Sequence, residues 1–109
     1  MAYSTWNFKR GDNNCIARTQ LVDENNAPVA ISGAVVRFHM GVRGQAASVD
    51  SVATIITAAT GIVQYSLTSG NLSVAGTFDA EWQVTFANGD IQTFPSDRND
   101  VIKITEQVA

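Results

Sequence analysis

Apolar and polar residues alternate along this chain with a period of two, in short segments separated by Gly, Asn, Asp and Ser. This period is typical of half-buried β-strands. The clearest segment covers residues 77–86. Its apolar face is Phe78, Ala80, Trp82, Val84 and Phe86, and its polar face is Asp79, Glu81, Gln83 and Thr85. The pattern predicts a central strand with one buried and one solvated face.

The same alternation predicts eight strands, at residues 6–10, 15–22, 35–40, 52–57, 61–67, 77–86, 91–94 and 101–105. Asn88-Gly89 accepts the positive φ angles of a type I′ turn and predicts a hairpin between the strands on either side. Pro95 ends the returning strand because proline has no N–H for the ladder. Residues 52–57 and 61–67 are expected to pair as a second hairpin.

Strands spaced by roughly 8–12 residues without a long linker favour two packed sheets over a βαβ arrangement. We therefore expect one all-β domain over residues 1–109, an immunoglobulin-like antiparallel β-sandwich of about seven to eight strands, with a small barrel as the alternative. The lone Cys15 cannot form an internal disulfide. Burial of Phe38, Tyr65, Phe78 and Trp82 is expected to hold the core instead.

Charge and composition exclude some classes of binding partner. Charged residues make up 16% of the 109 residues, and the formal net charge of −3 leaves no basic surface for a phosphate backbone. No apolar run approaches the roughly 20 residues of a membrane helix, and the first residues lack the pattern of a secretory signal. We expect no nucleic-acid partner, no membrane partner, and synthesis and folding in a reducing host cytoplasm.

Little in the chain points to catalysis. His39 is the one candidate base, and no motif places a serine or cysteine beside it. Cys15 lies among alternating residues and is expected to act as a small buried apolar residue. Asp90, Asp97 and Asp100 are candidate calcium ligands near the Asn88-Gly89 turn, but their spacing matches no known calcium loop. The sequence therefore predicts no catalytic residue, no cofactor and no metal.

Four segments, taken together in their order, resemble a known family. They are Phe8-Lys9-Arg10-Gly11-Asp12, residues 21–38, Gly61-Ile62-Val63-Gln64-Tyr65 and residues 76–89. In this order they resemble the N-terminal domain of tailed-phage baseplate upper proteins and their small virion relatives. The resemblance implies an immunoglobulin-like sandwich. Family members often carry a long C-terminal extension with fibre or receptor-binding parts; because this chain ends at Ala109, we expect a stand-alone adaptor or decorating subunit.

The resemblance implies a non-enzymatic structural protein of the virion, a small adaptor at the tail, baseplate or fibre junction that acts through protein–protein contacts. A capsid cement or decoration protein is the alternative, and a carbohydrate-binding or adhesin module is a further one. The expected partners are other virion proteins of the tail, baseplate, fibre or capsid, in a symmetric oligomer. Both terminal segments are expected to add strands to a neighbour's sheet. The candidate contact residues are Tyr3, Trp6, Phe8, Phe94, Val101 and Ile104.

Overall fold

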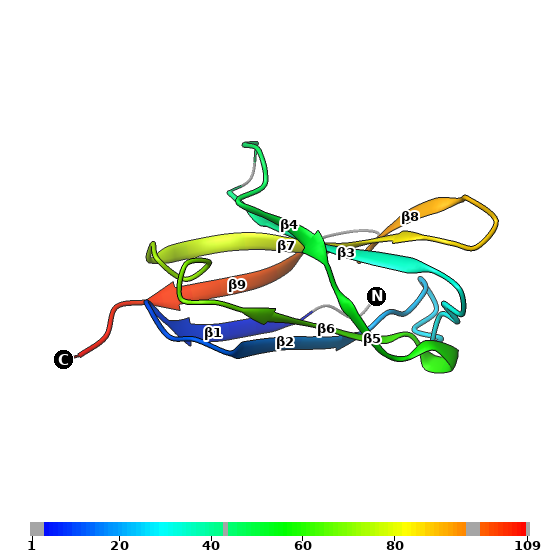
Figure 1. Cartoon of the computed structure of the whole chain (residues 1–109), viewed down its shortest axis with the longest axis horizontal. Coiled ribbons are helices and arrows are strands. Elements are labelled where there is room, and N and C mark those ends of the chain that lie inside the picture. Colours follow the sequence, from blue (N-terminus) through cyan, green and yellow to red (C-terminus); the bar gives the residue numbers. More distant parts are fainter. Residues whose placement is uncertain (1–3, 43, 96–98, 109) are drawn as a thin grey trace.

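A computed structural model describes residues 4–42, 44–95 and 99–108. These residues form two β-sheets packed face to face, with one short 3₁₀ turn, η1 (Ala58–Thr60) (Figure 1). The strands are β1 (Thr5–Lys9), β2 (Cys15–Gln20), β3 (Val35–Gly41), β4 (Val49–Val52), β5 (Thr54–Thr57), β6 (Ile62–Leu67), β7 (Gly76–Thr85), β8 (Ile91–Phe94) and β9 (Asp100–Thr105). The predicted all-β sandwich is confirmed, with nine strands in place of seven or eight.

The larger sheet has the order β1-β9-β7-β3-β4, and the smaller sheet has the order β2-β6-β5. Strand β7 is the longest, and two strands share one of its edges. Its first half, from Gly76 to Ala80, pairs with β9, and its second half, from Trp82 to Thr85, pairs with β8. Strands β8 and β9 therefore lie end to end along the same edge of β7.

One strand pair departs from the antiparallel expectation. Strand β1 lies parallel to β9, with Thr5 opposite Val101 and Lys9 opposite Thr105. The remaining strand pairs of both sheets are antiparallel. The first and last strands of the described chain thus lie side by side at one edge of the larger sheet.

The strand predicted at residues 52–57 is two strands in different sheets. Strand β4 pairs with β3 in the larger sheet, whereas β5 pairs with β6 in the smaller one. The break falls at Ala53, which is buried and whose N–H donates to the carbonyl of Val36 at 2.8 Å. A small side chain lets the chain turn the corner between the sheets. The predicted hairpin of 52–57 with 61–67 is confirmed for its β5–β6 part.

The hairpin between β7 and β8 is also confirmed, but its turn is not type I′. A type I′ turn needs positive φ at two residues, and here Gly89 has φ +95 while Asn88 does not have a positive φ. The N–H of Gly89 donates to the carbonyl of Phe86, and the N–H of Phe86 donates to that of Asp90. The loop is therefore three residues long with its left-handed residue last, a form that also suits the twist of the strands.

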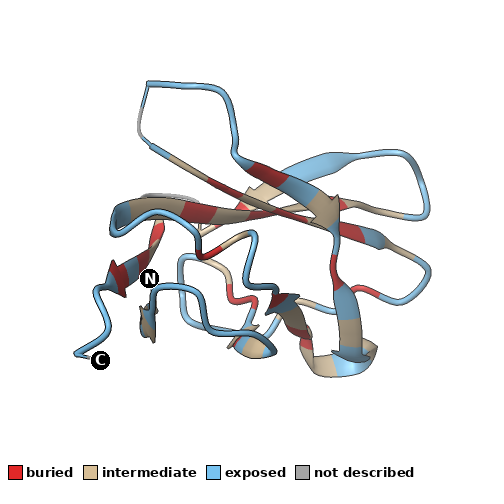
Figure 2. Cartoon of the chain, turned by 60° about the vertical axis from the view of Figure 1, so that its left-hand side comes forward, coloured by how far each residue is buried: buried red, intermediate tan, exposed pale blue. Residues whose placement is uncertain are grey.

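The core lies between the two sheets, where the inward faces of the strands meet (Figure 2). The alternation along β7 and β3 predicted this face, because Trp82, Val84, Phe38 and Met40 are at most 1% exposed. Tyr65 of β6 stacks on Phe38 with ring centroids 4.8 Å apart. Of the four aromatic residues expected to hold the core, Phe38 and Trp82 are buried, whereas Tyr65 and Phe78 are partly buried and pack against it.

Candidate functional site

The first described strand packs back onto the core. Trp6 and Phe8 are half-buried and contact the core cluster, while the intervening residues of β1 are exposed. The ring of Trp6 meets that of Trp82 edge-on, with centroids 6.4 Å apart and an interplanar angle of 68°. This geometry is favourable for aromatic pairs. Much of the surface of these two predicted contact residues is therefore used within the chain itself.

A buried carboxylate holds the start of this strand. Asp100 is 1% exposed and accepts two hydrogen bonds, one from the backbone N–H of Ser4 at 2.7 Å and one from Trp82 Nε1 at 3.0 Å. Burial raises the pKa of the Asp100 carboxyl above its usual value. The local pattern indicates Asp100 only as a candidate metal ligand, because the contact between this aspartate and Trp82 joins residues of different strands.

The three aspartates considered for calcium do not form a described cluster. Asp90 is exposed in the hairpin turn and accepts a hydrogen bond from Asn88 Nδ2 at 3.2 Å, whereas Asp100 is buried against Trp82. Asp97 lies outside the described residues. Within residues 4–42, 44–95 and 99–108, no three His, Cys, Asp or Glu side chains gather in a way that could hold a metal ion.

The other predicted contact residues occupy different environments. Phe94 and Ile104 are 6% and 2% exposed and belong to the core, Val101 is half-buried, and Tyr3 lies outside the described residues. Strand β9 lies between β1 and β7, so residues 101–105 have no open edge to offer a neighbour. The expectation that the C-terminal strand adds to another sheet is thus corrected, and only the outer edge of β1 stays open at this side.

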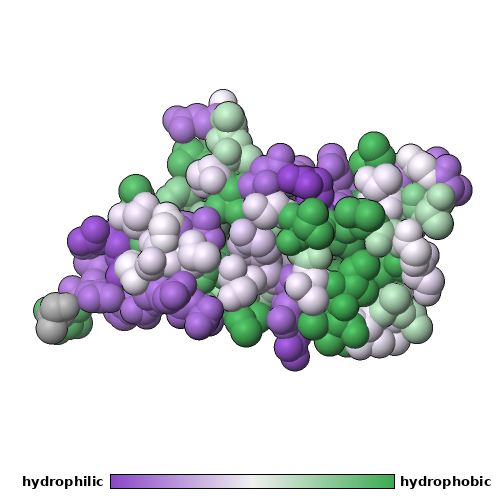
Figure 3. Space-filling view, in the orientation of Figure 1, coloured by the Kyte–Doolittle hydropathy of each residue, from purple (hydrophilic) through white to green (hydrophobic). Residues whose placement is uncertain are grey.

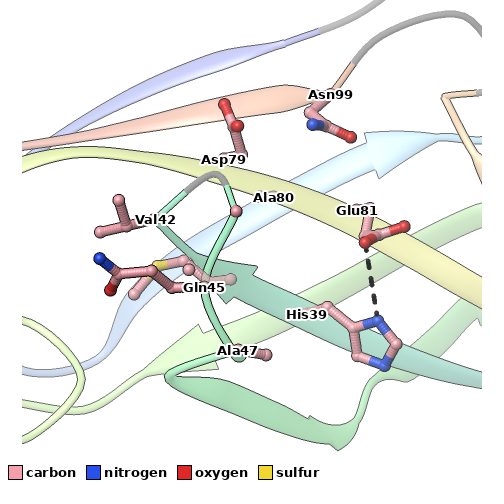
Figure 4. A pocket seen from close by; sticks show the side chains of 11 residues that line it. His39, Val42, Gln45, Ala47, Asp79, Ala80, Glu81 and Asn99 are labelled. Carbon is pink, nitrogen blue, oxygen red and sulfur yellow. Dashed lines mark ion pairs between the residues drawn. The ribbon is translucent and has the colours of Figure 1, made fainter.

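His39 lies on the outer face of β3, between two carboxylates from the neighbouring strands. Its Nε2 is 3.2 Å from Asp50 Oδ1 on β4, and its Nδ1 is 4.0 Å from Glu81 Oε1 on β7 (Figure 4). Arg37 Nε donates to Asp50 Oδ1 at 2.8 Å, and this hydrogen bond holds the pKa of the Asp50 carboxyl below its usual value. Arg37 and Asp50 form a cross-strand ion pair of the kind that stabilises a sheet surface.

A groove of about 230 Å³ lies beside His39, between the loop after β3 and the outer face of β7. It is lined by His39, Met40, Gly41, Val42, Gly44, Gln45, Ala47, Asp79, Ala80, Glu81 and Asn99. This lining brings neither a hydroxyl nor a thiol to the histidine. Among the described residues, the groove therefore brings the imidazole no serine, threonine, tyrosine or cysteine side chain from which it could take a proton.

Cys15 begins strand β2 and packs against the core, but it is half-buried rather than buried as expected. Its Sγ contacts the carbonyl oxygen of Asn13 at 3.9 Å. Burial, followed by the negative charge of Asp12, raises the pKa of the Cys15 thiol. A thiol that stays protonated is a weak nucleophile, which fits a structural role for this residue.

The exposed apolar surface is aliphatic. The large apolar side chains that are exposed in the described chain are Ile16, Val35, Val42, Val52, Ile56, Val74, Ile91 and Val108. Figure 3 shows hydrophobic surface gathered over β5 and the end of β4, which carry Ile56 and Val52. No aromatic ring is exposed among the residues that the structure describes. Sugar-binding faces use exposed rings for stacking, so this surface suits contact with another protein better.

Comparison with known proteins identifies the family. The sequence profile described as the BppU N-terminal domain matches residues 3–97. The chain belongs to this family. BppU is a baseplate upper protein, so the chain is a structural component of a phage baseplate and thus of the virion, as the resemblance implied. No curated protein sequence matches the chain.

A solved structure supports the fold alone. The chain resembles the crystal structure of CopC from Methylosinus trichosporium OB3b with a TM-score of 0.55, over 97% of this chain and 88% of that one. The two sequences are 7% identical. Fold similarity at this level says nothing about function. No helix in the part of the chain that the structure describes has the length and apolarity needed to cross a bilayer.

Proposed function

We propose that this protein is a non-enzymatic adaptor of the phage baseplate, a single β-sandwich domain over residues 1–109 that joins neighbouring virion proteins through surface contacts. The observation that carries the proposal is the match to the BppU N-terminal domain over residues 3–97. The described lining of the groove beside His39 brings no hydroxyl or thiol to the imidazole, and this supports a role without catalysis. We further propose that the chain acts in a symmetric oligomer, binds neither nucleic acid nor membrane, and folds in the host cytoplasm before assembly.

Among the predicted contact residues, the structure favours those on β1. This strand is at an edge of the larger sheet, where the exposed parts of its side chains can contact a neighbour. Trp6 and Phe8 remain half-buried, so each keeps part of its surface for a neighbour. Phe94 and Ile104 contribute to the same function by supporting the sandwich from within the core.

The proposal is tested by immunogold electron microscopy of purified particles, with an antibody raised against this chain. Gold at the tail tip is the expected result. Gold over the head would instead show that this chain is a capsid decoration protein. Particles without gold would overturn the virion role of this chain, and glycan-array binding of the isolated protein would then test the carbohydrate-binding alternative.

A further inference from the structure

Within residues 4–42, 44–95 and 99–108, no strand pairs with the outer edge of β8. Strands β8 and β9 lie end to end along β7, and β1 covers the outer edge of β9. No described strand covers the outer edge of β8 in the same way. In the order of the sheet, an additional strand at this edge would take the place beside β8 that β1 takes beside β9.

The backbone of β8 is oriented to accept such a strand. Opposite residues in an antiparallel pair alternate between hydrogen-bonded and non-hydrogen-bonded positions. Phe86 and Asp90 form a bonded position, since the N–H of Phe86 donates to the carbonyl of Asp90 at 2.8 Å. The register places Ile91 and Thr93 at non-bonded positions. Their N–H and carbonyl groups thus point away from β7, toward the open edge.

The other open edges in the described chain carry features that discourage pairing with a foreign strand. Strand β1 ends in Lys9, β2 carries Arg18 and β4 carries Asp50. Strand β5 has a register shift between Ile55 and Thr57. Charges and bulges are the means by which natural sheets protect their edges. Strand β8 is uncharged and pairs with β7 without a shift, so its edge has no such protection.

A groove of about 360 Å³ runs beside this edge. It is lined by Asp23, Glu24, Val29, Gln92, Thr93 and Phe94. The groove wall formed by residues 23–29 is held in place, because Asp23 Oδ1 accepts hydrogen bonds from the N–H groups of Asn25 and Ala27 at 2.8 and 3.0 Å. The groove combines an apolar part, Val29 and Phe94, with an acidic rim.

The negative charge of the groove rim indicates which kind of partner the groove can bind. Asp23 and Glu24 are the charged residues of the lining, and both are acidic. Pairing of β8 with β8 of a second copy about a two-fold axis would bring two acidic rims to one junction, where like charges repel. A strand that carries a lysine or arginine would instead meet opposite charge. The groove is therefore better suited to a different protein than to a second copy.

We propose that the open edge of β8 binds an extended segment of a neighbouring baseplate protein. The segment adds a strand through the outward backbone groups of Ile91 and Thr93. It places an apolar side chain against Val29 and Phe94, and a lysine or arginine against Asp23 and Glu24. This inference rests on the proposed adaptor function and specifies the surface that performs it.

The test uses the full chain, tagged and supplied during infection, and measures its amount in purified particles by immunoblot. Thr93→Pro removes an outward N–H and leaves the bonds to β7 in place, since proline is tolerated at the solvent side of an edge strand. Glu24→Lys reverses a charge of the rim. Glu106→Lys is the control, because it makes the same charge change at an exposed residue after β9. It also removes an ion pair with Arg10, which lies at the surface and contributes little to stability. Thermal melting of each purified variant checks that it is folded.

We expect Thr93→Pro and Glu24→Lys each to lower incorporation by about tenfold or more, a loss equivalent to roughly 1.4 kcal/mol of binding free energy. We expect Glu106→Lys to be incorporated as well as the native chain. If both groove variants are incorporated as well as the native chain, the β8 site is wrong, while the adaptor function is unaffected. If Thr93→Pro alone lowers incorporation, strand addition at β8 stands, but the partner segment does not use a lysine or arginine against the acidic rim. If Thr93→Pro does not fold, Glu24→Lys decides the proposal.

Two further results separate the remaining alternatives. Light scattering that shows a native dimer, converted to a monomer by Thr93→Pro, would assign the edge to a second copy and overturn the proposal. Absence of the native chain from particles would overturn the adaptor function itself.

Discussion

Trp82 Nε1 donates a hydrogen bond of 3.0 Å to Asp100 Oδ2 in the centre of the larger sheet. Both residues are almost fully buried, at 0% and 1% exposure. The other carboxylate oxygen accepts the backbone N–H of Ser4. One side chain on β9 therefore holds both the central strand β7 and the residue before β1. A buried carboxylate satisfied in this way links the two ends of the chain through the core.

Trp82→Phe should lower the free energy of unfolding by about 1–3 kcal/mol, since it keeps a ring in the core but leaves Asp100 Oδ2 without its donor. Trp82→Ala should cost more, about 3–5 kcal/mol, because it also opens a cavity. Urea unfolding followed by circular dichroism measures both changes. A Trp82→Phe variant as stable as the native chain would show that the hydrogen bond adds nothing to stability.

Asp100 should make stability depend on pH in the direction opposite to an ion-paired carboxylate. Its pKa is raised by burial, so the folded state holds this proton more tightly than the unfolded chain. Stability should fall as the pH rises from the unfolded value of about 3.9 through the raised folded value. Melting temperatures of the native chain and of Asp100→Asn, compared between pH 3 and pH 7, isolate the effect. A constant difference between the two curves would refute it.

Gly61→Ala should destabilise the fold more than Gly44→Ala. Both glycines have positive φ, +72 and +83, so alanine costs each position roughly 1–2 kcal/mol. At Gly61 a Cβ would also lie 2.5 Å from the carbonyl oxygen of Val29, whereas nothing lies within 4 Å at Gly44. Thermal melts of the two variants measure the difference, and equal losses would contradict the close approach of residues 29 and 61.

Trp6→Ala should destabilise the isolated protein, because the edge-on contact with Trp82 contributes about 0.5–1.5 kcal/mol beyond the apolar area that it buries. Asn7→Ala is the matched control, since Asn7 is exposed on the same strand and its loss should change stability by less than about 0.5 kcal/mol. Chemical unfolding of the two variants gives the comparison. If neither variant changes stability, the Trp6 side chain contributes to partner binding and not to the stability of the fold.

The alternation of residues was sufficient to predict most strands and their inward faces. On β7 and β3 the period of two places Trp82 and Phe38 on the buried face, and this follows from local geometry because successive side chains point to opposite sides. The Asn88-Gly89 turn likewise marked the β7–β8 hairpin, although its type depended on how the loop closed.

Tertiary structure decided which strands are neighbours. The switch of sheets at Ala53, the parallel pairing of β1 with β9 and the burial of Asp100 depend on residues far apart in the chain, and no local pattern encodes such contacts. The same holds for the candidate binding surface. Gln92 and Thr93 are ordinary polar strand residues in the sequence, and they line a groove only because residues 23–29 fold beside them. Period and turn chemistry determine the strands, whereas long-range packing determines which of their edges stay open.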